Sequence, residues 1–293
     1  MTVPAAIRVA AATGDVLGES PCWVAATGHL YWVDLRRPAL HRLDPATGIV
    51  ESWPMPEVIG AVVPRASGGV VVALKHGVHA FDPGRGTLSP IAIVEEGPPG
   101  NRLNDAKCDA RGRLLCGSMW DYGLQRTGGL HRVHPSGAVE RIRGEVTVAN
   151  AIAFAPDGRT LYFADTRRGD IERAGYDPAT GAVGPWSPFA AAGAAPGHPD
   201  GATVDAEGFL WNARYQGSCL ARFSPDGRLD RIVALPVSQP TSCAFGGPGL
   251  RTLYVTTATQ KLDAGRLAAE PLAGSLLALE VGVAGREEPG FAG

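Results

Sequence analysis

The chain of 293 residues has few cysteines and no long apolar run. Its five cysteines form no CxxC pair and lack the spacing of a zinc site, so we expect reduced, buried thiols of a cytosolic protein. No segment approaches the roughly 20 apolar residues of a membrane helix. The segment 1–15 has neither the basic nor the apolar region of a signal peptide. We therefore expect a cytoplasmic protein with no membrane partner.

The chain also has no large excess of positive or negative charge. The formal net charge is −2 and charged residues make up 19% of the chain, which gives no electrostatic reason to expect a nucleic-acid partner. The sequence contains no GxSxG elbow and no phosphate-binding loop. A hydrophobic content of 45% is enough to fill a core. The sequence does not indicate an oligomeric state.

Sustained helical periodicity is absent as well; the segment 262–274 has the pattern of at most one or two turns. Glycine and proline number 39 and 24, which is typical of many short strands joined by tight turns. Six segments share a turn followed by an apolar strand. They are TGHLYWVD (27–34), SGGVVVAL (67–74), RGRLLCGS (111–118), DGRTLYFAD (157–165), EGFLWNAR (207–214) and GLRTLYVTT (249–257).

These repeats recur every 40 to 49 residues. Six copies of this length, each with several strands, favour an all-β fold, a six-bladed β-propeller spanning residues 1–293 as a single domain. The segment 5–12 precedes the first copy and has no partner there. We expect it to join the last blade and close the ring, because an open edge strand promotes aggregation.

An earlier strand precedes each of these segments, and its start has a carboxylate or a carboxamide in four of the six copies. The residues in register are Glu19, Gly60, Asn104, Asn150, Asp200 and Thr241, spaced by 41 to 50 residues. The first strand of a propeller blade lines the central channel, so these positions should meet at one end of it. We interpret Gly18 and Pro21 as the turn that aims Glu19 into the channel. Asp165 and Thr166 should end a strand near the other rim.

Converging carboxylates and carboxamides predict a site for a hard cation such as Ca²⁺, Mg²⁺ or Mn²⁺, because these ions prefer oxygen ligands. Empty, the carboxylates would repel one another. Any one of these residues taken alone is better explained as a polar group at a turn. Four of them in register favour a site.

Five segments together resemble the gluconolactonase, regucalcin and senescence-marker-protein family of six-bladed propellers. They are LGESPCW, NRLNDAKCDARGRLLCGSM, ANAIAFAPDGRTLYFADT, HPDGATVDAEGFLWNARY and TSCAFGGPGLRTLYVTTA. The resemblance covers nearly the whole chain. It implies hydrolysis of a sugar lactone to the aldonic acid.

The resemblance also implies roles for particular residues. One divalent metal would be held by Glu19, Asn150 and Asp200, with Ca²⁺ first and Zn²⁺, Mn²⁺, Mg²⁺ or Fe²⁺ as alternatives. Asp200 would be the catalytic acid and base, while Arg102 and Asn104 would bind substrate.

Two positions depart from the family pattern. A substrate-binding acidic position of the family falls on Tyr122, with Asp121 beside it, and either could serve. Ala151 stands where the family has glycine after Asn150, which carries a cost if that residue needs a positive φ.

Two other function classes remain open. One is a related propeller esterase or phosphotriesterase, although those enzymes often have a channel histidine and no histidine is in register here. The other is a non-catalytic calcium-binding or protein-binding propeller.

Overall fold

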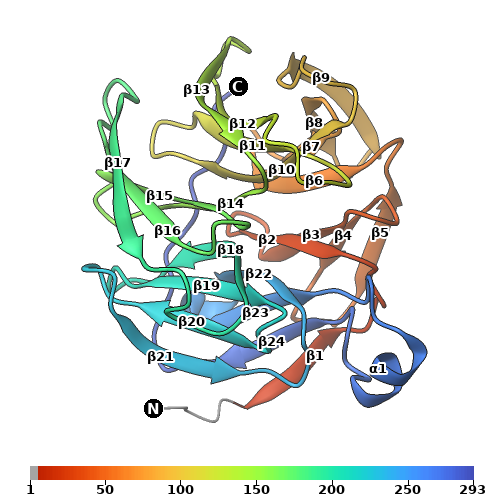
Figure 1. The fold of residues 1–293 in the computed structure, drawn as a ribbon. Helices are drawn as coiled ribbons and strands as arrows, with labels where there is room; N and C mark the ends of the chain where they lie inside the picture. The colour runs from red at the N-terminus through yellow and green to blue at the C-terminus, as the bar shows by residue number, and fades with distance from the viewer. Residues whose placement is uncertain (1–5) are drawn as a thin grey trace.

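Short strands dominate the fold, as the turn-rich repeats predict. The structure is a computed structural model in which residues 6–293 are described. Those residues form six four-stranded antiparallel sheets, arranged as the blades of a propeller (Figure 1). The predicted six-bladed β-propeller is therefore confirmed. The predicted domain limits, 1–293, stay a prediction.

Each blade follows the chain from its inner strand to its outer strand, except the last. Blade 1 contains β2 (Gly18–Val24), β3 (His29–Asp34), β4 (Ala39–Leu43) and β5 (Val50–Pro54). Blade 2 contains β6 (Ile59–Pro64), β7 (Val70–Leu74), β8 (Gly77–Asp82) and β9 (Thr87–Ile93). Blade 3 contains β10 (Asn101–Cys108), β11 (Leu114–Trp120), β12 (Gly128–Val133) and β13 (Val139–Val146).

The second half of the ring repeats this order. Blade 4 contains β14 (Ala149–Phe154), β15 (Thr160–Asp165), β16 (Ile171–Tyr176) and β17 (Val183–Ala190). Blade 5 contains β18 (His198–Val204), β19 (Leu210–Tyr215), β20 (Cys219–Phe223) and β21 (Leu229–Ala234). Blade 6 contains β22 (Pro240–Gly246), β23 (Thr252–Thr257), β24 (Leu276–Glu280) and, outermost, β1 (Ile7–Ala11).

The N-terminal strand closes the ring. β1 pairs antiparallel with β24, with Ile7 opposite Leu279 and Val9 opposite Leu277. The expectation that the segment 5–12 joins the last blade is confirmed for the part that is described, since Ala5 lies outside the described residues. Each inner strand contacts the inner strands of both neighbouring blades, so the six of them surround the axis.

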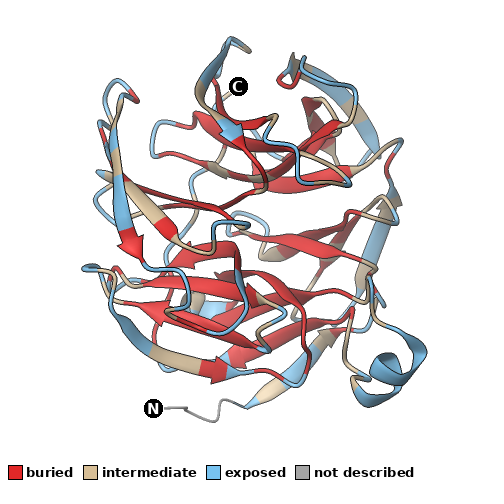
Figure 2. Ribbon diagram, viewed as in Figure 1, coloured by how far each residue is buried: buried red, intermediate tan, exposed pale blue. Residues whose placement is uncertain are grey.

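The core lies between blades, because each sheet is apolar on both faces near the axis. Six clusters of buried side chains each join two neighbouring blades. Figure 2 shows buried inner strands and more exposed outer strands. All five cysteines are free and buried, as predicted. Their burial fits a packing role, since an apolar environment disfavours the reactive thiolate.

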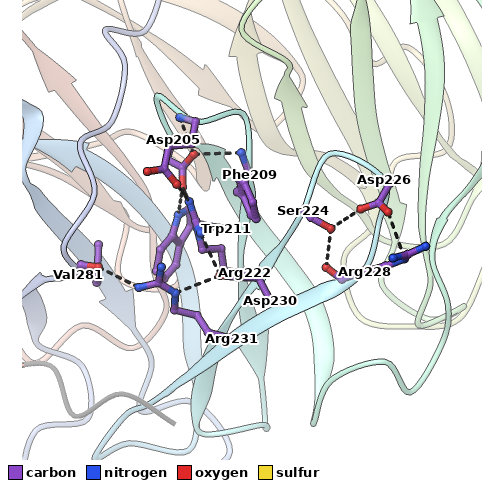
Figure 3. A network of polar contacts seen from close by, with 11 residues as sticks. Asp205, Phe209, Trp211, Arg222, Ser224, Asp226, Arg228, Asp230, Arg231 and Val281 are labelled. Carbon is purple, nitrogen blue, oxygen red and sulfur yellow. Dashed lines mark hydrogen bonds and ion pairs between the residues drawn. The ribbon is translucent and has the colours of Figure 1, made fainter. Parts of the chain in front are cut away.

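Buried ion pairs brace the blades away from the axis. In blade 5 the Asp205 carboxylate is fully buried and accepts hydrogen bonds from Trp211 Nε1 at 2.9 Å and from Arg222 Nε at 2.8 Å (Figure 3). Arg222 also pairs with Asp230 at 2.9 Å. Because every member has a partner, the network fixes the turn before β19 against the strand β20.

The C-terminal segment leaves blade 6 and ends beside blades 2 and 3. Phe291 is fully buried and packs in the cluster between those blades. Its N–H donates to Pro64 O at 2.8 Å, and its carbonyl accepts from Ala66 N at 2.8 Å. Lys107 of β10 forms an ion pair with Glu288. The end of the chain therefore ties blade 6 to the opposite part of the ring.

Helices contribute little to residues 6–293. A 3₁₀ turn, η1 (Pro248–Leu250), precedes β23, and the helix α1 (Ala264–Ala269) lies between β23 and β24. This agrees with the single short helical pattern expected within 262–274. Across this described part of the chain, no helix has the length and apolarity of a membrane span.

Candidate functional site

Each inner strand has an irregularity near its start, next to the residue that the repeats place in register. The β2–β3 register shifts between Glu19 and Cys22, and the β14–β15 register shifts between Asn150 and Ala153. Ser20 and Ala151 adopt positive φ of 51° and 53° there. A β-bulge of this kind redirects a side chain out of the strand's normal alternation.

The bulges show that the predicted turn at Gly18 and Pro21 is wrong, and they show which φ Ala151 adopts. Gly18 and Pro21 do not form a turn, since both lie within the strand β2; the bulge at Ser20 is what redirects the chain beside Glu19. Ala151 does adopt a left-handed conformation, as the glycine of the family pattern would do more easily. For a residue with a Cβ this conformation costs roughly 1–2 kcal/mol.

Four of the six residues in register line one cavity of about 500 Å³. They are Glu19, Asn104, Asn150 and Asp200, contributed by blades 1, 3, 4 and 5. The predicted convergence of these four positions is therefore confirmed. All four side chains are nearly buried, with Glu19 8% and Asp200 6% exposed, so they form the base of the cavity.

The other two positions in register have packing roles. A Cβ at Gly60 would lie 2.5 Å from Leu103 O, so the next blade occupies the space that a side chain needs. Thr241 is fully buried and its hydroxyl contacts Thr256 Oγ1 at 2.9 Å and Gly18 O. Neither residue lines the cavity.

A directed chain of hydrogen bonds links the polar residues at the base. Arg102 Nη1 donates to Asn104 Oδ1 at 2.6 Å, and Asn104 Nδ2 donates to Asn150 Oδ1 at 3.0 Å. Asn150 Nδ2 donates to Thr166 Oγ1 at 2.8 Å, and Thr166 donates to Pro199 O at 2.8 Å. Since all donors point the same way, each bond polarises the next. The chain also fixes the Asn150 amide, with Nδ2 toward Thr166.

Thr166 corrects a second prediction. Asp165 and Thr166 were expected at the other rim of the channel. β15 runs antiparallel to β14, with Asp165 paired to Ala149, so the end of β15 lies at the same rim as Asn150. Asp165 accepts hydrogen bonds from Thr147 N at 2.8 Å and Val148 N at 3.0 Å, which holds the chain entering β14.

Asp121 and Tyr122 both line the cavity, but their surroundings differ. The Asp121 carboxylate contacts Arg102 Nε at 2.5 Å and Arg36 Nη1 at 2.9 Å. These two guanidinium groups hold the pKa of Asp121 below its ordinary value, against the effect of burial. Tyr122 is 79% exposed, and the Arg36 guanidinium lies 4.3 Å from its ring centroid. Asp121 is therefore a fixed anion in the wall, and Tyr122 stands at the mouth.

Three acidic residues lie close to one another, and two of them line the base of the cavity. Burial raises the pKa of Glu19, and the charges of Asp200 and Asp105 raise it further. Burial and the charge of Asp105 likewise raise the pKa of Asp200. Burial raises the pKa of Asp105 itself to about 6. The group of acids is thus electrostatically unfavourable on its own and is suited to a cation.

The donor set at the base fits a hard divalent cation. Glu19 and Asp200 offer carboxylate oxygens, and Asn150 offers Oδ1, whose second lone pair is not used by Asn104. All three residues line the same cavity. Within residues 6–293 no group of three or more His, Cys, Asp or Glu side chains has the arrangement of a metal site.

Sequence reasoning missed several residues around the cavity. Arg36 follows β3 and reaches Asp121 from another blade, which no local pattern reveals. Asp105 directly follows Asn104, and its carboxylate accepts from Ile152 N at 2.9 Å in the next blade. Ser20 makes an equivalent link, because its Oγ accepts from Val62 N at 3.0 Å. A polar residue directly after the residue in register, at Ser20 and Asp105, is the signal that could have found these two links between blades.

Comparison with known proteins groups the chain with sugar lactonases. The chain matches the model of the SMP-30/gluconolactonase/LRE-like region over residues 17–259. It is 37% identical to 6-deoxy-6-sulfogluconolactonase of Pseudomonas putida over 95% of this chain and 96% of that protein. It is 36% identical to L-arabinolactonase of Azospirillum brasilense over 96% of this chain and 94% of the relative.

A solved structure supports the same grouping. The crystal structure of a calcium-binding protein, regucalcin, from Agrobacterium tumefaciens matches with a TM-score of 0.95 and 32% identity, covering 99% of both chains. The similarity therefore extends over all six blades.

Proposed function

The chain belongs to the SMP-30/gluconolactonase/LRE-like family, and from this premise we propose that it hydrolyses a sugar lactone to the corresponding aldonic acid. The names of its relatives support this reaction class, since they include 6-deoxy-6-sulfogluconolactonase and L-arabinolactonase. The observation that carries the proposal is the meeting of Glu19, Asn150 and Asp200 at the base of one cavity.

Glu19, Asn150 and Asp200 would hold one divalent cation. Oxygen ligands favour Ca²⁺, and the similarity to a calcium-binding regucalcin supports this choice, with Zn²⁺, Mn²⁺, Mg²⁺ and Fe²⁺ as alternatives. When bound, the ion would act as a Lewis acid toward the lactone carbonyl. Both carboxylates would then be ionised, because a nearby cation lowers the pKa that burial raises.

Asp200 would carry the proton during the reaction. Its carboxylate oxygen accepts a proton from the attacking water as the new C–O bond forms at the carbonyl carbon. It returns that proton to the ring oxygen as the ring C–O bond breaks. The product acid loses a proton at neutral pH, so turnover can be followed by acid release. The Asp200 backbone is held for this role because its carbonyl accepts from Asn212 Nδ2 at 2.8 Å.

Arg102 and Asn104 would position the substrate. Nε and Nη1 of Arg102 are engaged with Asp121, Leu103 and Asn104, while Nη2 has no hydrogen-bond partner among residues 6–293. Nη2 is therefore the group to donate to a sugar hydroxyl or carbonyl. Both N–H groups of Asn104 are used, by Ala149 O and Asn150 Oδ1, so its oxygen would accept from a hydroxyl.

The proposal is tested by acid release from a panel of glucono-, xylono-, arabino- and galactonolactones, with and without EDTA. We expect turnover that EDTA abolishes and that Asp200→Asn reduces at least about a hundredfold at unchanged stability. Asp157→Asn, an exposed aspartate in the turn before β15, is the matched control. Wild-type rates in Asp200→Asn would refute the role of Asp200.

The same panel separates the other function classes. Turnover of aryl esters or phosphotriesters without lactone turnover would indicate the related propeller esterases. Calcium binding without any turnover would indicate a non-catalytic propeller.

A further inference from the structure

We propose that the substrate lactone carries an anionic group, such as a phosphate, sulfonate or carboxylate, which Arg167 and Lys261 bind at the mouth of the cavity. This inference rests on the proposed lactonase function and narrows its substrate class. It is carried by two cations that line the cavity from different blades and have no side-chain partner among residues 6–293.

Arg167 and Lys261 come from separate parts of the ring. Arg167 lies in the turn between β15 and β16 in blade 4, and Lys261 follows β23 in blade 6. Both side chains are exposed and both line the cavity, on either side of blade 5. Across residues 6–293, the ion pairs and side-chain hydrogen bonds include neither the Arg167 guanidinium nor the Lys261 ammonium.

The other two arginines of the cavity each pair with a protein carboxylate. Arg36 and Arg102 share the Asp121 carboxylate, with contacts of 2.9 Å and 2.5 Å. A divalent ion would balance Glu19 and Asp200. Arg167 and Lys261 are then surplus positive charge at the entrance, which attracts an anion and lowers the affinity for a cationic one.

Two polar residues, Tyr215 and Gln260, line the same cavity as Arg167 and Lys261. Tyr215 ends β19 in blade 5, and its hydroxyl accepts from Gln260 Nε2 at 3.3 Å. Burial and the charge of Asp200 raise the pKa of Tyr215 to about 12, whereas the charge of Arg167 opposes this shift.

The backbone at Lys261 is held in a costly conformation. Lys261 has φ of 61°, and Gln216, which also lines the cavity, has φ of 60°. Such residues persist only where the surrounding structure imposes the conformation, and they cluster at ligand sites. Here Gln260 N donates to Val16 O at 2.9 Å and Gln239 Nε2 donates to Gln260 O at 2.9 Å, which fixes the chain before Lys261.

The test compares glucono-δ-lactone with its 6-phospho and 6-deoxy-6-sulfo derivatives and with glucarolactone, by acid release corrected for spontaneous hydrolysis. We expect wild-type kcat/KM to be at least about tenfold higher for the anionic lactones at low salt, since charge-assisted contacts are among the stronger ones. The preference should shrink as salt rises, because exposed charges are screened. The derivative preferred most identifies the anion.

The double variant Arg167→Gln/Lys261→Asn should reduce the ratio of kcat/KM for anionic over neutral lactone to near one. Asparagine is chosen because it tolerates the left-handed conformation. Arg251→Gln is the matched control, since Arg251 is exposed and lies outside the cavity; it should leave the ratio unchanged.

The outcomes distinguish failure of this inference from failure of the proposed lactonase function. Hydrolysis of neutral lactone at the same or higher kcat/KM overturns the inference and leaves the lactonase proposal standing. An anionic preference that survives in the double variant also overturns it. Hydrolysis of neither class refutes the lactonase proposal and this inference together.

Discussion

Thr166 offers a sharp test of the site because it touches neither substrate nor cation in the proposal. Its hydroxyl accepts from Asn150 Nδ2 and donates to Pro199 O, each at 2.8 Å. Thr166→Val keeps the branched shape and removes both bonds. The Asn150 amide then loses one of the two hydrogen bonds that fix its orientation, leaving the bond from Asn104, and the carbonyl before Asp200 loses the Thr166 donor. Both changes disturb oxygens that would hold the cation.

The expected loss follows from these two bonds. Leaving a buried polar group without its partner costs roughly 1–3 kcal/mol, and water entering from the cavity recovers part of that. Removing a group that orients a metal ligand typically weakens metal affinity by about 10- to 100-fold. We therefore expect Thr166→Val to weaken calcium binding about 10- to 100-fold, or about 1.4–2.8 kcal/mol.

Calorimetric titration of calcium into chelator-treated protein measures this directly. Thr166→Ser retains the hydroxyl and should bind within about threefold of wild type. Thermal unfolding of both variants without metal checks that the fold is intact. Binding by Thr166→Val as tight as by wild type, in a folded protein, would refute the argument that Thr166 orients Asn150.

Three further predictions concern the protein without metal. Burial raises the pKa of Asp105 to about 6, so the folded state holds its proton more tightly than the unfolded state; stability should fall as pH rises from about 4 to 6, and urea unfolding of Asp105→Asn should show a shallower fall. Ala151→Gly should cost about 1–2 kcal/mol less in urea unfolding than Ala153→Gly, because only Ala151 has a positive φ; equal losses would contradict the strain. Asp205→Ala should lower the free energy of unfolding by about 3 kcal/mol, because it leaves Arg222 and Trp211 Nε1 without their buried acceptor; calorimetry showing an unchanged melting temperature would contradict this.

The sequence predicted the architecture because a propeller is a repeated local unit. The turn-plus-strand segments became the second strand of each blade, and the register of Glu19, Asn104, Asn150 and Asp200 located the cavity. Ring closure could be predicted from the unpaired edge alone. The assignment of roles to these residues stays a prediction.

The contacts between blades could not be predicted from the sequence repeats. The bulges change which residue faces the axis, and the left-handed conformation of Ser20 follows from the next blade, where its hydroxyl bonds to Val62. The rim predicted for Thr166 was wrong because β15 runs antiparallel to β14 and ends at the rim where β14 begins. Arg36 meets Asp121 across residues far apart in the chain, and such long-range pairs leave no local pattern.

The pairing of β1 with β24 has a consequence for synthesis of the protein. Ile7 is translated well before its partner Leu279, because blades 1 to 5 lie between them in the chain. Blade 6 can therefore be completed only after those blades have been translated, and bringing these distant strands together carries a loop-closure cost. Until then β1 has no partner strand and its edge stays open to other chains. Nascent or C-terminally truncated chains should therefore be the species most prone to aggregate and most in need of chaperones.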